Sequence, residues 1–252
     1  MPIKNANPPK IKDYQPTLTP KPEQKPHIIK KALLILISSF IISSIGLCAL
    51  LRWMSPPTTA FMLHQHVDDF FNDQAFTAIH YQWVSGDKIA KHAFLAVIAA
   101  EDQHFFEHAG FDLNAIESAI EHYVDGGSLR GASTLSQQVA KNLFLTPHKN
   151  FIRKGLEVWF TVLCEALWSK ERILLMYLNI AEFGDHIFGI EAASHYYFGT
   201  SAQKINREQA ALLAATLPNP LLLKALQPTK AVIKRQQWIL RQMRNLELPA
   251  AE

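Results

Sequence analysis

The sequence predicts a mainly α-helical domain that follows one N-terminal transmembrane helix. Three observations support this: an uncharged run at 32–51, apolar residues that recur every three or four positions from about residue 60, and no long alternation typical of β-strands. A chain of 252 residues has room for one large domain or two small ones. Its 48% hydrophobic and 19% charged residues are ordinary for a globular protein with some extra apolar content.

The N-terminal region predicts a tail and a membrane anchor. Residues 1–31 are rich in proline and lysine and poor in large apolar side chains, which is typical of a disordered tail. The next segment, Ala32–Leu51, is 20 residues without a charge and would span about 30 Å as a helix, the thickness of a bilayer's hydrocarbon core. A cleaved signal peptide is the alternative, but the segment is long, lies far from the N-terminus and has no clear cleavage site. We therefore expect a retained anchor.

Charge is distributed unevenly along the chain. Seven lysines and two acidic residues precede residue 32, so the remainder is slightly negative although the whole chain is +3. The lysines predict that the N-terminus lies in the cytoplasm and the large domain outside, which at a bacterial inner membrane is the periplasm. The lack of a basic domain argues against nucleic-acid binding. The eleven histidines and two cysteines show no zinc-ligand spacing, so we expect no metal site.

A short linker at 52–60 precedes the domain, which we expect at 61–246. Helical periodicity is present in five stretches: 90–106, 133–145, 151–168, 169–183 and 206–217. We expect the second stretch to begin with a Ser133 cap. The glycine-rich loop Asp125–Ser133 is the segment best suited to move. The basic residues near the C-terminus predict a solvated helix face; they are Lys230, Lys234, Arg235, Arg241 and Arg244.

The stretch AVIAAEDQHFFEHAGFD, Ala96–Asp112, places a carboxylate at the end of an apolar stripe. On a helix over 91–106, Glu101 continues the apolar face, whereas Asp102 lies about 100° away. That face consists of Phe94, Val97, Ile98 and Phe105. A carboxylate in apolar surroundings has a raised pKa, as a general base or acid requires. A solvated helix end is equally compatible with this stretch alone.

The motif RKGLE places two cations beside an acid, because Arg153 and Lys154 share a helix face with Glu157. Two interpretations remain open at this point. One is a surface salt bridge worth a few tenths of a kcal/mol. The other is an anion site, in which both cations hold a phosphate and Glu157 orients one of them.

The helix that follows Ser133 has a polar face. Amide groups and a lysine on one face suit sugar hydroxyls and phosphate oxygens, although many amphipathic helices look similar. The residues of this face are Thr134, Gln137, Gln138 and Lys141, with Asn142 at its edge.

These stretches together resemble the ordered motifs of the peptidoglycan glycosyltransferases of glycosyltransferase family 51. The four that carry the resemblance are EDQHFFEHAGFD, GASTLSQQVAKNLFL, RKGLE and SKERILLMYLNIAEFG. The first matches E-D-x-x-F-x-x-H-x-G-x-D in full, with His108 either shaping the turn or serving the site. A later stretch, YYFGTSAQKINREQAALLAATLPNP, is also similar, so the resemblance covers about 75–245.

The resemblance implies a lysozyme-like helical fold with a small membrane-facing jaw near 113–132, and an enzyme that polymerises lipid II into glycan strands. By this resemblance Glu101 is the base that deprotonates the 4-hydroxyl of the acceptor's GlcNAc. That oxygen attacks C1 of the donor's MurNAc with inversion, and undecaprenyl pyrophosphate leaves. Glu157 matches the second catalytic carboxylate. The matching substrate-binding positions are Asp102, Ser133, Gln137, Gln138, Lys141, Asn142, Arg153 and Lys154.

No cofactor is expected, because the lipid-linked donor stores the energy and lysine and arginine can stabilise the leaving group; a divalent cation stays open as a stimulator. The expected partners are lipid II, the growing strand and the membrane, with other cell-wall synthesis or division proteins left open. Ser201–Lys204 spells S-x-x-K, but no serine and no K-T-G follow, so we expect no transpeptidase activity. Two alternatives are a lysozyme-like lytic enzyme acting on finished glycan and a non-catalytic membrane-anchored scaffold.

Overall fold

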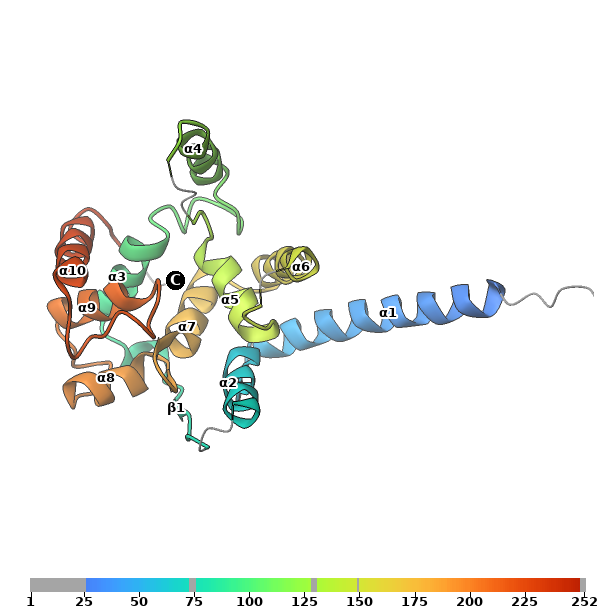
Figure 1. The fold of residues 1–252 in the computed structure, drawn as a ribbon, viewed down its shortest axis with the longest axis horizontal. Helices are drawn as coiled ribbons and strands as arrows, with labels where there is room; N and C mark the ends of the chain where they lie inside the picture. The colour runs from blue at the N-terminus through green and yellow to red at the C-terminus, as the bar shows by residue number, and fades with distance from the viewer. Residues whose placement is uncertain (1–25, 73–75, 128–130, 149, 250–252) are drawn as a thin grey trace, which may run out of the picture. The chain divides into compact units, whose positions relative to one another are not determined.

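The computed structural model describes residues 26–72, 76–127, 131–148 and 150–249. The chain divides into two compact units, Met1–Ile42 and Ser43–Glu252. Helix α1 spans Pro26–Leu51, and its part from Ile29 to Leu51 is long and apolar enough to cross a membrane (Figure 1). The predicted disordered tail lies outside the described residues up to position 25, and 26–31 are helical rather than part of a tail. Every described side chain from 29 to 42 is exposed, as expected of a helix that contacts lipid.

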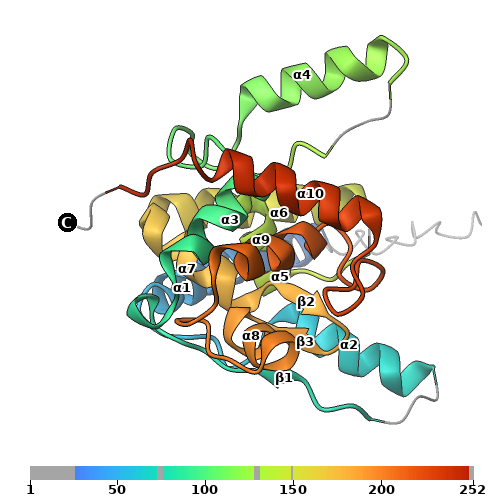
Figure 2. The same cartoon turned by 90° about the vertical axis from the view of Figure 1, so that its left-hand side faces the viewer.

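The second unit is mainly helical, which confirms the predicted fold class (Figures 1 and 2). Its helices are α2 (Ala60–Phe71), α3 (Lys91–Glu101), α4 (Leu113–Val124), α5 (Leu135–Phe144), α6 (Phe151–Leu167), α7 (Lys170–Ile180), α8 (Ile190–Phe198), α9 (Arg207–Thr216) and α10 (Lys230–Gln242), with a 3₁₀ turn at Gly86–Lys88. Its strands are β1 (His80–Tyr81), β2 (Glu182–Gly184) and β3 (Ile187–Phe188).

Six helices of the second unit form two packed groups that share a core. Helices α3, α9 and α10 contact one another, and so do α5, α6 and α7. Contacts between α3 and α7 join the groups, and the buried Phe105 and Tyr177 lie in the shared core. The C-terminal end of α3 therefore lies close to α5, α7 and α10, the helices that supply the polar side chains described below.

A small sheet in the order β1-β3-β2 packs beside α8. Strand β1 runs parallel to β3, and β2 runs antiparallel to it. The turn between β2 and β3 holds His186 at a φ of 58°, in the left-handed region. These strands agree with a sequence that shows no long alternation, because segments of two or three residues are too short to produce one.

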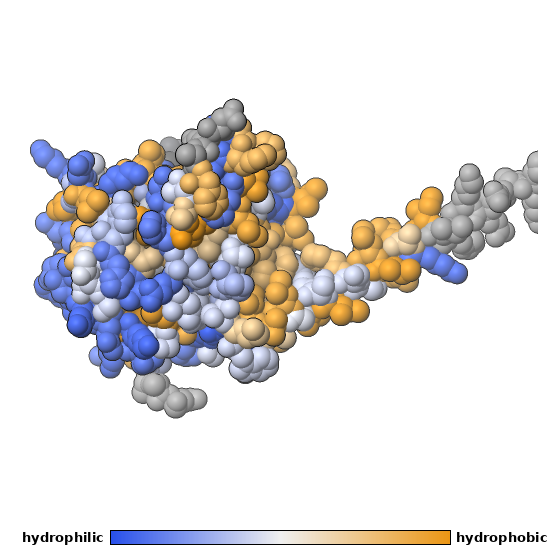
Figure 3. All heavy atoms as spheres, turned by 90° about the horizontal axis from the view of Figure 1, so that it is seen from below, coloured by the Kyte–Doolittle hydropathy of each residue, from blue (hydrophilic) through white to orange (hydrophobic). Residues whose placement is uncertain are grey.

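Helix α4 stands apart from the other helices in both ribbon views (Figures 1 and 2). It falls within the segment 113–132 expected near the membrane, and it exposes Leu113, Ile120, Tyr123 and Val124. At the start of α6, Phe151 is 99% exposed and Ile152 is also exposed. On the face of the second unit seen in Figure 3, which is opposite to α4, polar residues dominate one end and apolar residues the other.

Candidate active site

Glu101 is the last residue of α3, where the apolar stripe ends. The predicted helix over 91–106 is too long, because the backbone leaves the helix at Asp102 (φ −163°) and Phe105 is buried in the loop beyond. The Glu101 side chain is only 13% exposed. Burial raises the pKa of its carboxyl, as the sequence predicted, so the solvated helix end is excluded.

Two side chains from other helices hold the Glu101 carboxylate. Gln138 Nε2 on α5 donates to Oε2 at 3.0 Å, and Arg235 Nη2 on α10 donates to Oε1 at 3.0 Å. These contacts, together with the charge of Lys141, lower the pKa of Glu101 without cancelling the rise caused by burial. The result is a carboxylate that is both desolvated and fixed in orientation.

Arg235 was missed as a site residue by sequence reasoning. The interpretation of its segment as a solvated helix face is wrong at this position, since Arg235 also donates to the backbone oxygen of Ala100 at 3.1 Å. Its spacing from Val232 and Ile239, which are both buried, places it beside the apolar face of α10. That spacing is the only sign in the sequence that Arg235 could be part of the site. It does not predict that the partner is Glu101, which is 134 residues away.

Tyr177 fixes the orientation of the Gln138 side-chain amide. Its hydroxyl, on α7, donates to Gln138 Oε1 at 3.1 Å, so the amide nitrogen of Gln138 faces Glu101. Burial, with a smaller contribution from the charge of Glu101, raises the pKa of Tyr177 well above its ordinary value. Tyr177 therefore remains a protonated donor, and it is a second residue that was not expected from the sequence to serve the site.

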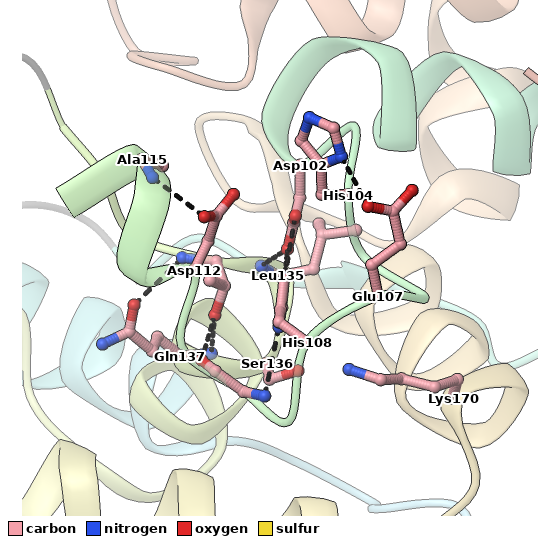
Figure 4. A network of polar contacts seen from close by, with 12 residues as sticks. Asp102, His104, Glu107, His108, Asp112, Ala115, Leu135, Ser136, Gln137 and Lys170 are labelled. Atoms are coloured by element: carbon pink, nitrogen blue, oxygen red, sulfur yellow. Dashed lines mark hydrogen bonds and ion pairs between the residues drawn. The ribbon is translucent and has the colours of Figure 1, made fainter. Parts of the chain in front are cut away.

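Asp102 is occupied by contacts within the protein (Figure 4). His108 Nε2 donates to Asp102 Oδ1 at 3.0 Å, and the backbone nitrogen of Leu135 donates to Oδ2 at 2.9 Å. The backbone nitrogen of Gly110 donates to His108 Nδ1 at 3.1 Å, which fixes the proton of the ring on Nε2. The network joins the end of α3 to the start of α5, so His108 shapes the turn, the first of its two expected roles.

The start of α5 differs from the predicted Ser133 cap. Thr134 is the N-cap, and it forms a capping box with Gln137, whose Oε1 accepts from the backbone nitrogen of Thr134 at 3.0 Å. Gln137 is buried by this role. Ser133 is exposed instead, on the wall of a cavity of about 270 Å³ that Glu101 also lines.

Glu157 lies on α6 and is buried, so the surface salt bridge considered from the sequence is excluded. Its side chain is 4% exposed, with Arg153 Nη1 at 2.8 Å from Oε2 and Lys154 Nζ at 2.5 Å from Oε1. A buried carboxylate with two cationic donors is satisfied at both oxygens. The Nε of Arg153 has no hydrogen-bond partner among the described residues, so this guanidinium retains donor capacity.

Lys141 and Asn142 lie on a second cavity, of about 250 Å³, which we call the Lys141 cavity. Burial lowers the pKa of Lys141, while the charges of Glu157 and Glu101 raise it. Lys141 Nζ lies 5.2 Å from the ring centre of Phe61. The cavity is lined by Phe61, Gln138, Lys141, Asn142, Tyr177, Ala181, Glu182, Leu217, Pro218, Asn219, Pro220 and Leu221.

The site therefore has two cavities, and one hydrogen bond connects a residue that lines the first to a residue that lines the second. Glu101 lines the first cavity, and its donor Gln138 lines the Lys141 cavity. The charges of Glu101 and Glu157 both raise the pKa of Lys141, so this lysine interacts with both carboxylates. Within the described residues, no group of three or more His, Cys, Asp or Glu side chains could hold a metal ion.

The fold and the site define a mainly helical domain with a buried carboxylate, Glu101, beside a cavity that Lys141 lines. Residues 71–244 match the family described as Transglycosylase, and the chain belongs to this family. The family resemblance read from the four sequence motifs is thereby confirmed.

Similar proteins from several bacteria carry the name biosynthetic peptidoglycan transglycosylase. One from Mannheimia succiniciproducens is 49% identical over 212 residues, which cover 84% of this chain and 87% of that protein. One from Pseudomonas aeruginosa is 49% identical over 207 residues, covering 82% and 89%. One from Shewanella oneidensis is 50% identical over 211 residues, covering 84% and 89%.

Proposed function

We propose that the chain is a peptidoglycan glycosyltransferase that polymerises lipid II into glycan strands. It transfers the growing strand from undecaprenyl pyrophosphate to the 4-hydroxyl of the GlcNAc of incoming lipid II. The family membership and the names of the relatives support this activity. The single observation that carries the mechanism is the buried Glu101 carboxylate. It accepts a hydrogen bond from Gln138, a residue that also lines the Lys141 cavity.

In this mechanism Glu101 is the general base. Its carboxylate takes the proton of the acceptor hydroxyl, whose oxygen bonds to C1 of the donor's MurNAc with inversion. The bond from C1 to the pyrophosphate oxygen breaks, and its electron pair leaves with undecaprenyl pyrophosphate. A base with a raised pKa suits this task because, in its ionised form, it has a higher proton affinity than an ordinary carboxylate.

Three cations stabilise the leaving pyrophosphate: Lys141, Arg153 and Lys154. Charges that are already fixed act on developing negative charge without reorganisation. Glu157 is the residue that orients two of these cations, through its contacts with Arg153 and Lys154. Ser133, Gln138 and Asn142 line the two cavities and are suited to hold sugar hydroxyl and acetamido groups.

Asp102 and Gln137 are expected from the family pattern to bind substrate. Both already have partners within the protein, in the Asp102–His108 network and in the capping box of α5. We propose that they act on substrate indirectly, by fixing the ends of α3 and α5 against each other.

The proposal includes the location of the chain at the membrane and its need for cofactors. The apolar part of α1 anchors the chain in the bacterial inner membrane, with the lysine-rich N-terminus in the cytoplasm and the domain in the periplasm. The exposed apolar residues of α4 and of the start of α6 contact the same membrane, where the lipid-linked substrate resides. No cofactor is required, a divalent cation is at most a stimulator, and no transpeptidase activity is expected from a sequence without S-x-N or K-T-G motifs after Ser201.

The test is polymerisation of purified lipid II by the full chain in detergent or vesicles. We expect glycan polymer from the unchanged protein and a loss of about 10²–10⁴-fold for Glu101→Gln, the range for removal of a general base. Circular dichroism would check that the isosteric variant is folded. Release of soluble muropeptides from cell-wall sacculi, with no polymer from lipid II, would instead identify a lytic enzyme. Equal activity of both proteins in cells would favour the scaffold.

A further inference from the structure

Glu182, the first residue of β2, faces the same cavity as Lys141 but has no part in the mechanism above. The short turn from the end of α7 brings it there, although it is 41 positions from Lys141 in the sequence. It lines the Lys141 cavity together with Asn142 and Asn219. A carboxyl group thus lies on the wall of the cavity in which Lys141 is proposed to bind an anion.

The Lys141 cavity is built to receive a polar ligand. Asn142 is only 7% exposed, and its Oδ1 has no hydrogen-bond partner among the described residues. A buried amide oxygen without a partner costs free energy that a bound donor group would recover. Lys141 on the same wall offers a charged donor, so the cavity accepts both hydroxyl and phosphate groups.

The charge of Glu182 depends on groups from several elements around it. Burial raises the pKa of its carboxyl to about 7, and the neighbouring charge of Asp185 acts in the same direction. His186 from the β2–β3 turn, Lys141 from α5 and Lys224 from the segment after α9 lower it. Tyr197 on α8 also senses this carboxylate, but burial raises the pKa of Tyr197 to about 12, so it stays neutral.

We propose that Glu182 is a positioning residue that sets the net charge of the Lys141 cavity, so that the pyrophosphate-linked donor binds more tightly when Glu182 is neutral than when it is ionised. The inference rests on the proposed function, because it takes the pyrophosphate as the ligand of Lys141. An ionised Glu182 attracts the ammonium group of Lys141 and repels the anionic ligand. A protonated Glu182 does neither, and it can donate a hydrogen bond to the ligand.

The experiment measures KM and kcat for lipid II from about pH 6 to about pH 8, the window in which this carboxyl titrates. We expect KM of the full-length protein to rise by about three- to tenfold across the window, the size of one partly screened charge contact. In Glu182→Gln the KM should stay near its low-pH value throughout, with kcat little changed. The matched control is Glu208→Gln, an exposed carboxyl at the start of α9, which should keep the full pH dependence of KM.

Calorimetric binding of inorganic pyrophosphate at both pH values gives a second readout that needs no turnover. The ligand's own protonation is common to both proteins, so the ratio of their affinities isolates Glu182. We expect a ratio near one at the lower pH and about three to ten in favour of Glu182→Gln at the higher pH. A KM that still rises with pH in Glu182→Gln, or an affinity ratio near one at both pH values, would overturn the inference and assign the titration to another group, such as Lys141. Failure of the proposed function is a separate result, since the unchanged protein would then form no polymer at any pH.

Discussion

The contact between Arg235 and Glu101 predicts a defined change in the pH dependence of the reaction. Replacing Arg235 with Gln removes a cation that donates to Glu101 Oε1 at 3.0 Å. In unit-charge terms such a contact is worth about 1–4 kcal/mol at effective dielectric constants between those of water and a protein surface. The Arg235 side chain is 35% exposed, which argues for the screened end of that range. We therefore expect the pKa of Glu101 to rise by about one unit, since one unit corresponds to about 1.4 kcal/mol.

The assay is the pH profile of kcat/KM for lipid II polymerisation. The base must be ionised, so the acidic limb of the profile reports the pKa of Glu101 and should move upward by about one pH unit in Arg235→Gln. Below the limb the variant should be about tenfold slower than the unchanged protein, and at alkaline pH the two should converge. Arg235→Lys should restore most of the shift, because it keeps the charge.

Two results would separate this reasoning from a general loss of structure. Lys234→Gln removes an exposed cation from the neighbouring position of the same helix, and it should leave the acidic limb unchanged. A uniform loss of activity at every pH in Arg235→Gln, without movement of the acidic limb of the profile, would refute an electrostatic role for Arg235.

Three further predictions concern the cations and the buried carboxyls. Lys141→Ala should raise KM for lipid II by about tenfold or more with the fold intact, because a buried charged donor to the pyrophosphate is lost; steady-state kinetics and circular dichroism check this. Glu157→Gln should lower the free energy of unfolding by about 2–4 kcal/mol, because the largely buried Arg153 loses its counter-charge; chemical denaturation checks this, and a change under about 0.5 kcal/mol would contradict it. Glu182→Gln should be the more stable protein at pH 8 by up to about 3 kcal/mol, and equally stable near pH 4. The sign follows because the folded state holds the Glu182 proton up to about pH 7, whereas the unfolded chain releases it near its ordinary value of 4.5, so the stability of the unchanged protein falls as pH rises between the two. Thermal unfolding at both pH values measures the difference.

Much of the architecture follows from the sequence alone. The uncharged run at 32–51 predicts one long apolar helix, and the periodicity of the segments around Glu101 and Glu157 predicts helices whose apolar faces pack inward. These features are local, because a helix satisfies its own backbone and its buried face repeats every three to four residues. Glu101 at the end of an apolar stripe and Glu157 beside two cations are visible for the same reason.

Only the tertiary structure decides what each carboxylate contacts. Arg235 reaches Glu101 from α10, Tyr177 orients Gln138 from α7, and Glu182 faces Lys141 from a strand of three residues. No periodicity encodes such pairs, since they depend on how helices far apart in the chain pack against one another.

The same limit explains why the sequence did not reveal the partners of Asp102 and Gln137 within the protein, and why Ser133 looked like a helix cap. A carboxylate, an amide and a hydroxyl suit both roles equally well, and only the position of the surrounding backbone donors separates them. In the folded chain the backbone amide of Leu135 donates a hydrogen bond to Asp102, and Thr134 rather than Ser133 caps α5. The sequence by itself determined which segments are helical and which side chains have suitable chemistry. Their partners, and so their pKa values and roles, were decided by packing, because desolvation and hydrogen bonding depend on neighbours that the local pattern does not contain.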